Sequence, residues 1–286
     1  MSVYQITSSL RARTRRRVVS DPVMAVAAVV LALVIAVAVF APLLAPYDPN
    51  AVDPMNVLSG PSAAHWLGTD DTGRDILSRL LYGSRPSLIA PAVVVVASTG
   101  AGTLLAVAGA WWGGWADRLV GGLLDLVFCF PGLIMAVVAA AVFGPGLPVP
   151  VAAISIAYLP FLARVLRAAA QKELSLPYMA ALKLLGLPTH RIWLRHLLPN
   201  LMPVIVVQAT VTFGYALLDV ASISFIGLGA QPPQAEWGLM VSSGYAQILS
   251  GQAGQVIFAG AAIVIVVVAC NLLGSGLSRR LLGEDL

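Results

Sequence analysis

The hydropathy pattern of the chain consists of long apolar runs separated by short polar segments. The first run, Val23 to Phe40, contains eighteen consecutive apolar residues. A bilayer core of about 30 Å needs about 20 helical residues, so this run predicts a membrane-spanning helix. A secretory signal has a shorter core of about 7–15 residues before its cleavage site. We therefore expect a retained first span.

Five further runs are long enough, or nearly so, to cross a membrane as helices. They are Ser87–Ala110, Leu119–Phe143, Pro150–Val165, Leu201–Ile226 and Val256–Leu273. The run at 150–165 is the weakest of these, because Pro150 and Pro160 interrupt it and Pro148 precedes it. The pattern thus predicts an all-α polytopic membrane protein with six transmembrane helices.

Basic residues predict the orientation, because Lys and Arg are enriched in cytoplasmic loops. Five arginines precede the first span: Arg11, Arg13, Arg15, Arg16 and Arg17. With six spans, the same side also carries Arg118, the loop at 164–196 and the pair Arg279-Arg280. That side then holds 14 of the 17 Lys and Arg residues. Both termini are therefore expected in the cytoplasm, since an odd number of spans would place Arg279-Arg280 on the other face.

This topology divides the chain into four parts. Residues 1–22 form a basic cytoplasmic tail, and residues 23–84 form the first span with an extracytoplasmic segment. Residues 85–275 form the main transmembrane domain, with a cytoplasmic loop at about 168–198. Residues 276–286 form the C-terminal tail.

Composition agrees with a membrane location. Hydrophobic residues make up 59% of the chain and charged residues only 10%, whereas soluble domains have about 25% charged residues. The two cysteines, Cys129 and Cys270, lie in apolar runs and form no C-x-x-C pair, so we expect neither a disulfide framework nor a thiolate metal site.

The extracytoplasmic segment is expected to contain a short helix at the membrane surface that leads into the second span. Thr69 or Asp70 can cap this helix, and Arg74 and Arg79 take its polar face. The apolar stripe at helical spacing consists of Ile76, Leu77, Leu80 and Leu81. A calcium loop through Asp70, Asp71 and Asp75 is rejected, because Leu81 stands where such a loop needs Glu. No metal site is expected.

The longest cytoplasmic loop is a punctuated, partly apolar segment. Pro177 ends a helix that continues from the fourth span, and a short helix from Tyr178 to Leu185 is expected to end at Gly186. Pro188 stops it, and Thr189 can cap the next helix. That helix carries Ile192, Trp193, Leu194 and Leu197 toward a second break at Pro199. Exposed apolar residues on a structured elbow predict a protein partner on the cytoplasmic side.

The chain carries no signature of an enzyme. It has no G-x-x-x-x-G-K-[ST] phosphate loop, and its only lysines, Lys172 and Lys183, do not follow a glycine. It also lacks H-E-x-x-H and G-x-S-x-G. We therefore expect no catalytic residue and no bound cofactor in this chain, and any ATP hydrolysis in another subunit.

Two carboxylates inside the spans are candidates for a substrate path, because ionisable residues in membranes are costly. Asp125 lies near the start of the third span, where a structural role is favoured. Asp219 fits a helix–helix hydrogen bond or a path-lining role equally well. If both were proton sites, the chain could instead be a self-sufficient proton-coupled transporter. Inverted repeats would favour that alternative, but no internal repeat is evident.

Several stretches resemble the permease subunits of bacterial ABC importers. The loop "AALKLLG…HLLPN" is similar to their Glu-Ala-Ala (EAA) loop, with Ala180 in place of the Glu. The corresponding positions are Ala180, Ala181, Leu182, Gly186, Leu198 and Pro199, and Leu182 replaces the second Ala of the pattern. The stretches "LGTDDTGRDILSRLLYGSRPSL", "LLDLVFCFPGLIMAV" and "SFIGLGAQPPQAEWGLM" resemble the C-type permease of dipeptide and oligopeptide importers. The resemblance spans about residues 20–280.

The resemblance implies a type I importer architecture in the bacterial cell membrane. Two homologous permeases form the pore as a heterodimer, two cytoplasmic ATPases drive it with ATP and Mg, and an extracytoplasmic binding protein delivers the substrate. The short helix of the loop would dock in an ATPase cleft and act as a rigid lever. The residues implied in this coupling are Tyr178, Met179, Ala181, Leu182, Lys183, Leu185 and Gly186.

The resemblance leaves the cargo open. Dipeptides, longer peptides, metal chelates and haem all fit the family. Membrane lipid is an expected neighbour, and no nucleic-acid partner is expected.

Overall fold

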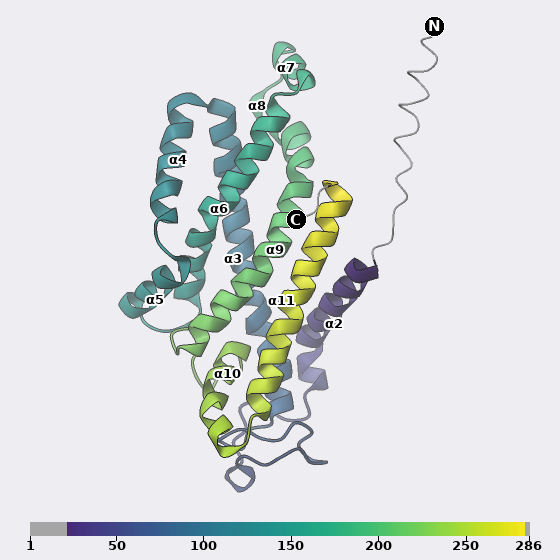
Figure 1. Cartoon of the computed structure of the whole chain (residues 1–286), viewed down its shortest axis with the longest axis vertical. Coiled ribbons are helices and arrows are strands. Elements are labelled where there is room, and N and C mark those ends of the chain that lie inside the picture. The colour runs from purple at the N-terminus through teal and green to yellow at the C-terminus, as the bar shows by residue number, and fades with distance from the viewer. Residues whose placement is uncertain (1–21, 284–286) are drawn as a thin grey trace.

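The computed structural model describes residues 22–283 as a bundle of long helices (Figure 1). The Arg-rich stretch at positions 11–17 lies outside these residues. The helices are α2 (Pro22–Leu44), α3 (Ile76–Trp112), α4 (Gly114–Phe128), α5 (Gly132–Phe143), α6 (Pro148–Leu174), α7 (Pro177–Leu184), α8 (Thr189–Ile192), α9 (Leu198–Phe225), α10 (Trp237–Tyr245) and α11 (Gly254–Leu281). Three short turns complete the set: η2 (Pro54–Asn56), the π-helical η3 (Trp193–Leu197) and η4 (Ala246–Ser250). The all-α prediction is confirmed, since residues 22–283 contain no strand beyond an isolated Thr69–Asp75 bridge.

Five helical segments of the described chain are long and apolar enough to cross a membrane. They are α2, α3, α6, α11 and the continuous segment from α8 through α9. The third predicted span, residues 119–143, is not one helix, because α4 and α5 meet at an angle of 76°. Pro131 explains the break, since it donates no N–H and restricts the backbone of Phe130. The predicted third span is therefore two helices bent against each other, and the described chain has six spans when this bent pair is counted as one.

The other predicted spans are confirmed as helices, and each extends beyond its predicted ends except α9, which ends one residue before the predicted Ile226. The predicted divisions after residues 84 and 275 fall inside α3 and α11, so the structure has no break at either point. Helices also continue through Pro42, Pro86, Pro91, Pro160 and Pro203. In membranes such helices persist because no water is present to satisfy an unwound backbone.

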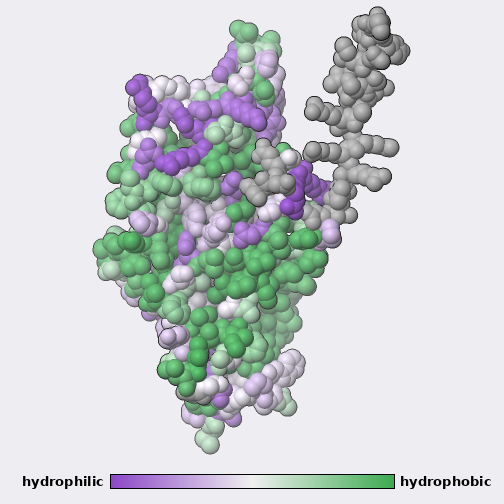
Figure 2. Space-filling model, viewed as in Figure 1, coloured by the Kyte–Doolittle hydropathy of each residue, from purple (hydrophilic) through white to green (hydrophobic). Residues whose placement is uncertain are grey.

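Helix α3 is the centre of the bundle. It packs along α6 and α9, while α11 lies against α9, α2 and α10. Small residues allow the close approach of α3 and α6, because a Cβ atom on Gly102 would lie only 3.3 Å from the backbone nitrogen of Ala163. On the face that Figure 2 shows, apolar residues cover most of the middle of the molecule, and polar residues gather toward the end that carries α7.

The segment between α2 and α3 forms a folded cap at the opposite end (Figure 1). The surface helix predicted here is not separate, because its residues are the first turns of α3. Asp75 caps that helix by accepting a hydrogen bond from Ser78 N at 2.8 Å. Thr69 and Asp70 are therefore not the caps that the sequence predicts. Asp70 instead closes the preceding turn, where its Oδ1 accepts a bond from Arg74 N at 2.9 Å.

Arg79 is buried and does not take the exposed face that the helical spacing predicts. Its side chain is 4% exposed, and its Nε lies 3.6 Å from Asp70 Oδ2. Its Nη1 donates to the carbonyl oxygens of Pro49 at 3.0 Å and Pro233 at 3.4 Å. Arg79 thus ties the cap to the loop before α10.

Candidate functional site

The punctuated loop forms an elbow that projects from the bundle, with α7 at its tip (Figure 1). Helix α7 begins at Pro177, because the first turn of a helix needs no N–H donor. Gly186 follows it with φ of +70°, a left-handed conformation that ends helices. The short helix predicted from Tyr178 to Leu185 is therefore confirmed to within one residue at each end.

Two details of the elbow differ from the sequence prediction. Thr189 does not cap α8, because Pro188 occupies the cap position and no side chain bonds there. The break predicted at Pro199 is also absent. Pro199 lies in the first turn of α9, and the irregularity falls one turn earlier, in the π-helical η3.

The inner face of α7 packs against its own chain. Met179 is fully buried in a cluster with Ile192, Leu197 and Leu201. Leu182 packs against the same cluster and is half-buried. In this structure Met179 therefore anchors α7 to the spans, and its predicted part in the partner contact stays a prediction.

The outer face of α7 is apolar and faces away from the protein. Leu184 is 90% exposed and Leu185 is 76% exposed. Ala181 and Lys183 are also exposed, and Tyr178 is partly so. The sequence reasoning missed Leu184. Leu184 lies about 140° around the helix from Met179 at 3.6 residues per turn, so its outward position follows once Met179 is known to be buried.

A hydrogen-bonded triad joins the base of α7 to the two spans beside it. The Tyr178 hydroxyl donates to Glu173 Oε1, at the end of α6. Asn200 Nδ2, in α9, lies 2.7 Å from Glu173 Oε1 and 2.8 Å from Tyr178 Oη. Burial and the Glu173 carboxylate raise the pKa of the Tyr178 hydroxyl, so Tyr178 stays protonated as the donor. Neither Glu173 nor Asn200 is among the predicted site residues.

The C-terminal end of α7 contacts the C-terminal end of α3, which the predicted topology places on the cytoplasmic side. Lys183 Nζ lies 4.5 Å from the centre of the Trp111 ring, a cation–π distance. Trp193 of η3 packs edge-on against both Trp111 and Trp112, at 6.0 and 5.6 Å between ring centres. Helix α7 is thus held at both ends, by α6 and α9 at one end and by α3 at the other.

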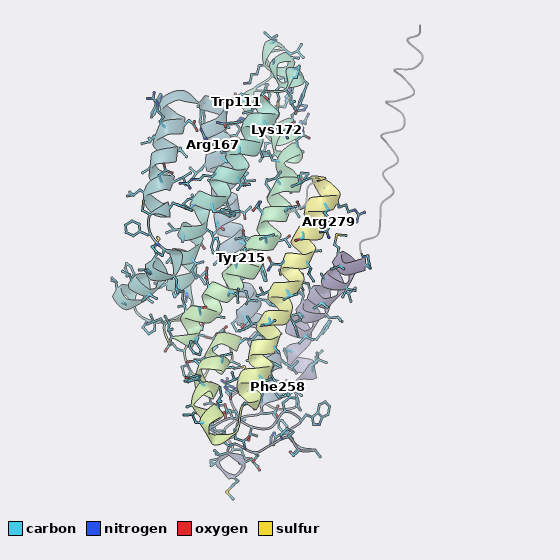
Figure 3. All side chains as sticks on the ribbon, in the orientation of Figure 1. Trp111, Arg167, Lys172, Tyr215, Phe258 and Arg279 are labelled. Atoms are coloured by element: carbon cyan, nitrogen blue, oxygen red, sulfur yellow. The ribbon has the colours of Figure 1, made fainter. Side chains whose placement is uncertain are left out.

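Asp125 forms an ion pair within the chain. Its Oδ1 accepts a bond from Arg164 Nη2 on α6, and the same guanidinium lies 4.4 Å from the centre of the Phe128 ring. A second pair joins Asp117 to Arg167. Both pairs fasten α4 to α6, and Arg167 lies on the half of the molecule that carries α7 (Figure 3). This geometry supports the structural role favoured for Asp125.

Asp219 also has a partner across helices, since Tyr158 of α6 donates to its Oδ2 at 2.8 Å. It lies on a polar stripe of α9 that runs along one face. The stripe consists of Gln208, Tyr215, Asp219 and Ser222, which helical geometry places within about 60° of one another. Tyr215 is 51% exposed, near mid-height in the bundle (Figure 3). An exposed polar face on a span indicates contact with water or another polar surface rather than lipid.

The loop before α10 holds a buried carboxylate. Glu236 is 0% exposed, caps α10 through Gly238 N at 3.0 Å and Leu239 N at 2.8 Å, and accepts a bond from Ser87 Oγ at 3.1 Å. Burial raises the pKa of this carboxyl, while the backbone N–H bonds oppose the rise. Trp237 beside it is also buried, so neither residue can contact a docking protein or act as an interfacial anchor.

Comparison with known proteins identifies the class of this helical membrane protein. Residues 98–282 match the family described as the binding-protein-dependent transport system inner membrane component. Residues 9–61 match the N-terminal transmembrane domain of oligopeptide transport permease C. The chain therefore belongs to the binding-protein-dependent permease family and is a multi-pass inner membrane protein.

Curated relatives cover nearly the whole chain. The dipeptide transport system permease protein DppC of Alkalihalophilus pseudofirmus is 38% identical, over 88% of this chain and 83% of that protein. The probable D,D-dipeptide transport system permease protein DdpC of Escherichia coli K12 is 39% identical, over 90% and 86%. The glutathione transport system permease protein GsiD of Pectobacterium atrosepticum is 38% identical, over 93% and 88%.

Family membership decides between the functional classes that the sequence left open. A component of a binding-protein-dependent system is a permease subunit, and it is not an enzyme. It also does not work as a self-sufficient proton-coupled transporter, so that alternative is wrong.

Proposed function

We propose that this chain is one permease subunit of an ATP-driven peptide importer and forms half of its pore with a second, homologous permease. The names of three relatives support peptide cargo, since they are permeases for dipeptides, D,D-dipeptides and glutathione. ATP and Mg are used by separate cytoplasmic ATPases, and an extracytoplasmic binding protein delivers the peptide.

The outer face of α7 is the contact with the ATPase. The observation that carries this assignment is the 90% exposure of Leu184 on a helix whose opposite face is anchored in the bundle. An apolar side chain so exposed outside the membrane is suited to a protein partner. Tyr178, Ala181 and Leu185 complete the contact, Lys183 borders it and Gly186 permits the turn that follows.

The energy available at this contact is of the right size. Driving a two-state pore from about 1:99 to 99:1 takes about 5.5 kcal/mol of differential binding. Burying one Leu side chain contributes about 1.5–3 kcal/mol. Two or three apolar side chains of α7 therefore suffice if the ATPase cleft moves, and the anchored inner face transmits that motion to the spans.

The polar stripe on α9 lines the transport path, with Asp219 as its carboxylate. Tyr215 and Ser222 of the stripe are exposed in this single chain and Gln208 and Asp219 are half-buried, as expected for a surface that a second permease closes. Asp125 contributes to the path only through its ion pair with Arg164, which sets the position of α4 beside α6.

The test compares two equally exposed leucines at opposite ends of the molecule. Leu184→Asp places a charge on the α7 face, and Leu249→Asp places one on η4, where Leu249 is 93% exposed. Because neither side chain packs inside the chain, both variants should fold and insert. Leu184→Asp should weaken ATPase binding by about 10- to 100-fold, measured as ATPase subunit co-purified with the permease, and should abolish ATP-driven uptake. Normal ATPase retention in Leu184→Asp would contradict the proposal.

A further inference from the structure

A deep apolar groove opens on the side of the bundle formed by α2, α3, α9 and α11. Its volume is about 810 Å³. Aliphatic and aromatic side chains dominate its wall, among them Leu31, Ile35, Leu88, Ile89, Ala92 and Phe213. Among the described residues that line it, Arg85 carries the only formal charge.

Arg85 is held in place by a local defect in α2. Pro42 has no N–H, so the carbonyl oxygen of Ala38, four residues earlier, lacks its normal helical donor. Arg85 Nε donates to that oxygen at 2.7 Å, and Nη2 donates to the Val39 oxygen at 3.0 Å. The guanidinium thus supplies the hydrogen bond that Pro42 cannot give to the Ala38 carbonyl oxygen, and these bonds fix Arg85 at the edge of the groove.

The charge of Arg85 has no anionic partner in the part of the chain that the structure describes. No carboxylate of residues 22–283 lies within ion-pair distance of it, and the nearest aromatic ring, Tyr82, is 5.8 Å away. A guanidinium offers five N–H donors, and two carbonyl oxygens engage only part of them. A cation at membrane depth needs a counter-charge.

The groove lies on the opposite side of α9 from the polar stripe. Ala209 and Phe213 face the groove, whereas Tyr215 and Asp219 lie on the stripe. At about 100° per residue, the centre of the groove-lining set Ala209, Thr210 and Phe213 lies roughly 160° from the centre of the four-residue stripe. Because the stripe is suited to water or a second chain, the apolar groove belongs on the lipid side.

The depth of the groove matches a lipid. Ala38 lies six residues before the end of α2, about 9 Å along the helix, which places Arg85 near the boundary between headgroups and hydrocarbon. From there the wall continues to Leu31 and Ala92, each about 10 Å farther toward the membrane centre. A polar group at Arg85 and a hydrocarbon chain below it would fill this shape.

We propose that the groove binds one membrane phospholipid, with an acyl chain along the apolar wall and its phosphodiester paired with Arg85. Arginine binds phosphate through charge-assisted, often bidentate hydrogen bonds. The lipid would bridge α2 to α3 and α9. Helix α2 needs such a bridge, since only three of its residues, Ala27, Ala38 and Ala41, are buried by protein.

The experiment measures lipid bound to the purified, delipidated permease complex by native mass spectrometry during titration. The probes are phosphatidylglycerol and a diacylglycerol with the same acyl chains but no phosphate. The wild type should bind one phosphatidylglycerol tightly and the diacylglycerol at least about tenfold more weakly, since a hydrogen bond to a charged group contributes about that factor.

Two variants probe the two halves of the site, with a matched control. Arg85→Ala removes the charge, and Ala92→Phe fills the groove while leaving Arg85 and its carbonyl bonds in place. Both should lose the tight phosphatidylglycerol, whereas Arg118→Ala, which removes an exposed arginine in α4, should bind as the wild type does. The proposal is overturned if Ala92→Phe retains the lipid, if diacylglycerol binds equally well, or if the second permease occupies the groove in the complex.

Discussion

Gly238 lies at a tight contact between α10 and α9. A Cβ atom there would lie 2.7 Å from the Ala221 Cα atom and still closer to the Ala221 carbonyl oxygen. Because these are backbone atoms, they cannot move aside as a side chain can. Gly238→Ala should therefore destabilise the protein by about 1–3 kcal/mol, measured as a lower thermal unfolding midpoint in detergent. Gly260→Ala, in α11 with no atom within 4 Å, should be neutral or stabilising by up to about 1 kcal/mol. Equal midpoints for both variants would refute this interpretation.

Individual residues were predictable where their role depends on backbone chemistry alone. Gly186 and Pro177 indicate the two ends of α7 from the sequence alone. Gly favours the left-handed backbone conformation that ends a helix, and Pro lacks the N–H that the first turn of a helix does not need, so both effects are local. The roles of Met179 and Arg79 depend on which face of a helix meets the rest of the fold, and the sequence does not contain that information. Arg79 was predicted to be exposed because charged residues usually are, but backbone carbonyl oxygens from two loops enclose it.

Among the elements, α7 is joined to α6 and α9 by hydrogen bonds of Glu173, Tyr178 and Asn200, and a single substitution can test their role. Asn200 joins Glu173 of α6 to Tyr178 of α7, so Asn200→Ala should weaken the attachment of α7 to the spans while leaving its outer apolar face unchanged. Uptake per ATP hydrolysed should fall several-fold, because each exposed hydrogen bond contributes only about 0.5–1.5 kcal/mol, while ATPase binding stays normal. Thr189→Ala is the control, since the Thr189 side chain makes no capping bond. An unchanged coupling ratio in Asn200→Ala would show that the triad is structural only.

The helices themselves were largely readable from hydropathy, whereas their interruptions were not. Pro131 divides α4 from α5, yet Pro42, Pro86 and Pro160 lie inside continuous helices. Tertiary contacts can keep a helix continuous at a proline. At Pro42, the Ala38 carbonyl oxygen that lacks its helical donor accepts a hydrogen bond from Arg85. Whether a proline breaks a span therefore depends on a partner elsewhere in the fold.

At the scale of the whole molecule, the positions of three basic residues distinguish one end of the bundle from the other. Arg167, Lys172 and Arg279 all lie in the half that carries α7 (Figure 3). The folded cap between α2 and α3 lies at the other end with α10 (Figure 1). Because Lys and Arg favour the cytoplasmic side, the α7 end should face the cytoplasm.

Two single cysteines test this orientation directly. In a background with Cys129→Ser and Cys270→Ala, Leu249→Cys marks the end with the folded cap and Leu184→Cys marks the α7 end, where the native leucines are 93% and 90% exposed. A membrane-impermeant maleimide should label Leu249→Cys in intact spheroplasts, because that end is expected to face the outer compartment. It should label Leu184→Cys only after the membrane is opened, and this second labelling shows that the thiol itself is reactive. Labelling of Leu184→Cys in intact spheroplasts would place α7 outside, where no cytoplasmic ATPase could reach it, and would contradict the orientation and the coupling proposal together.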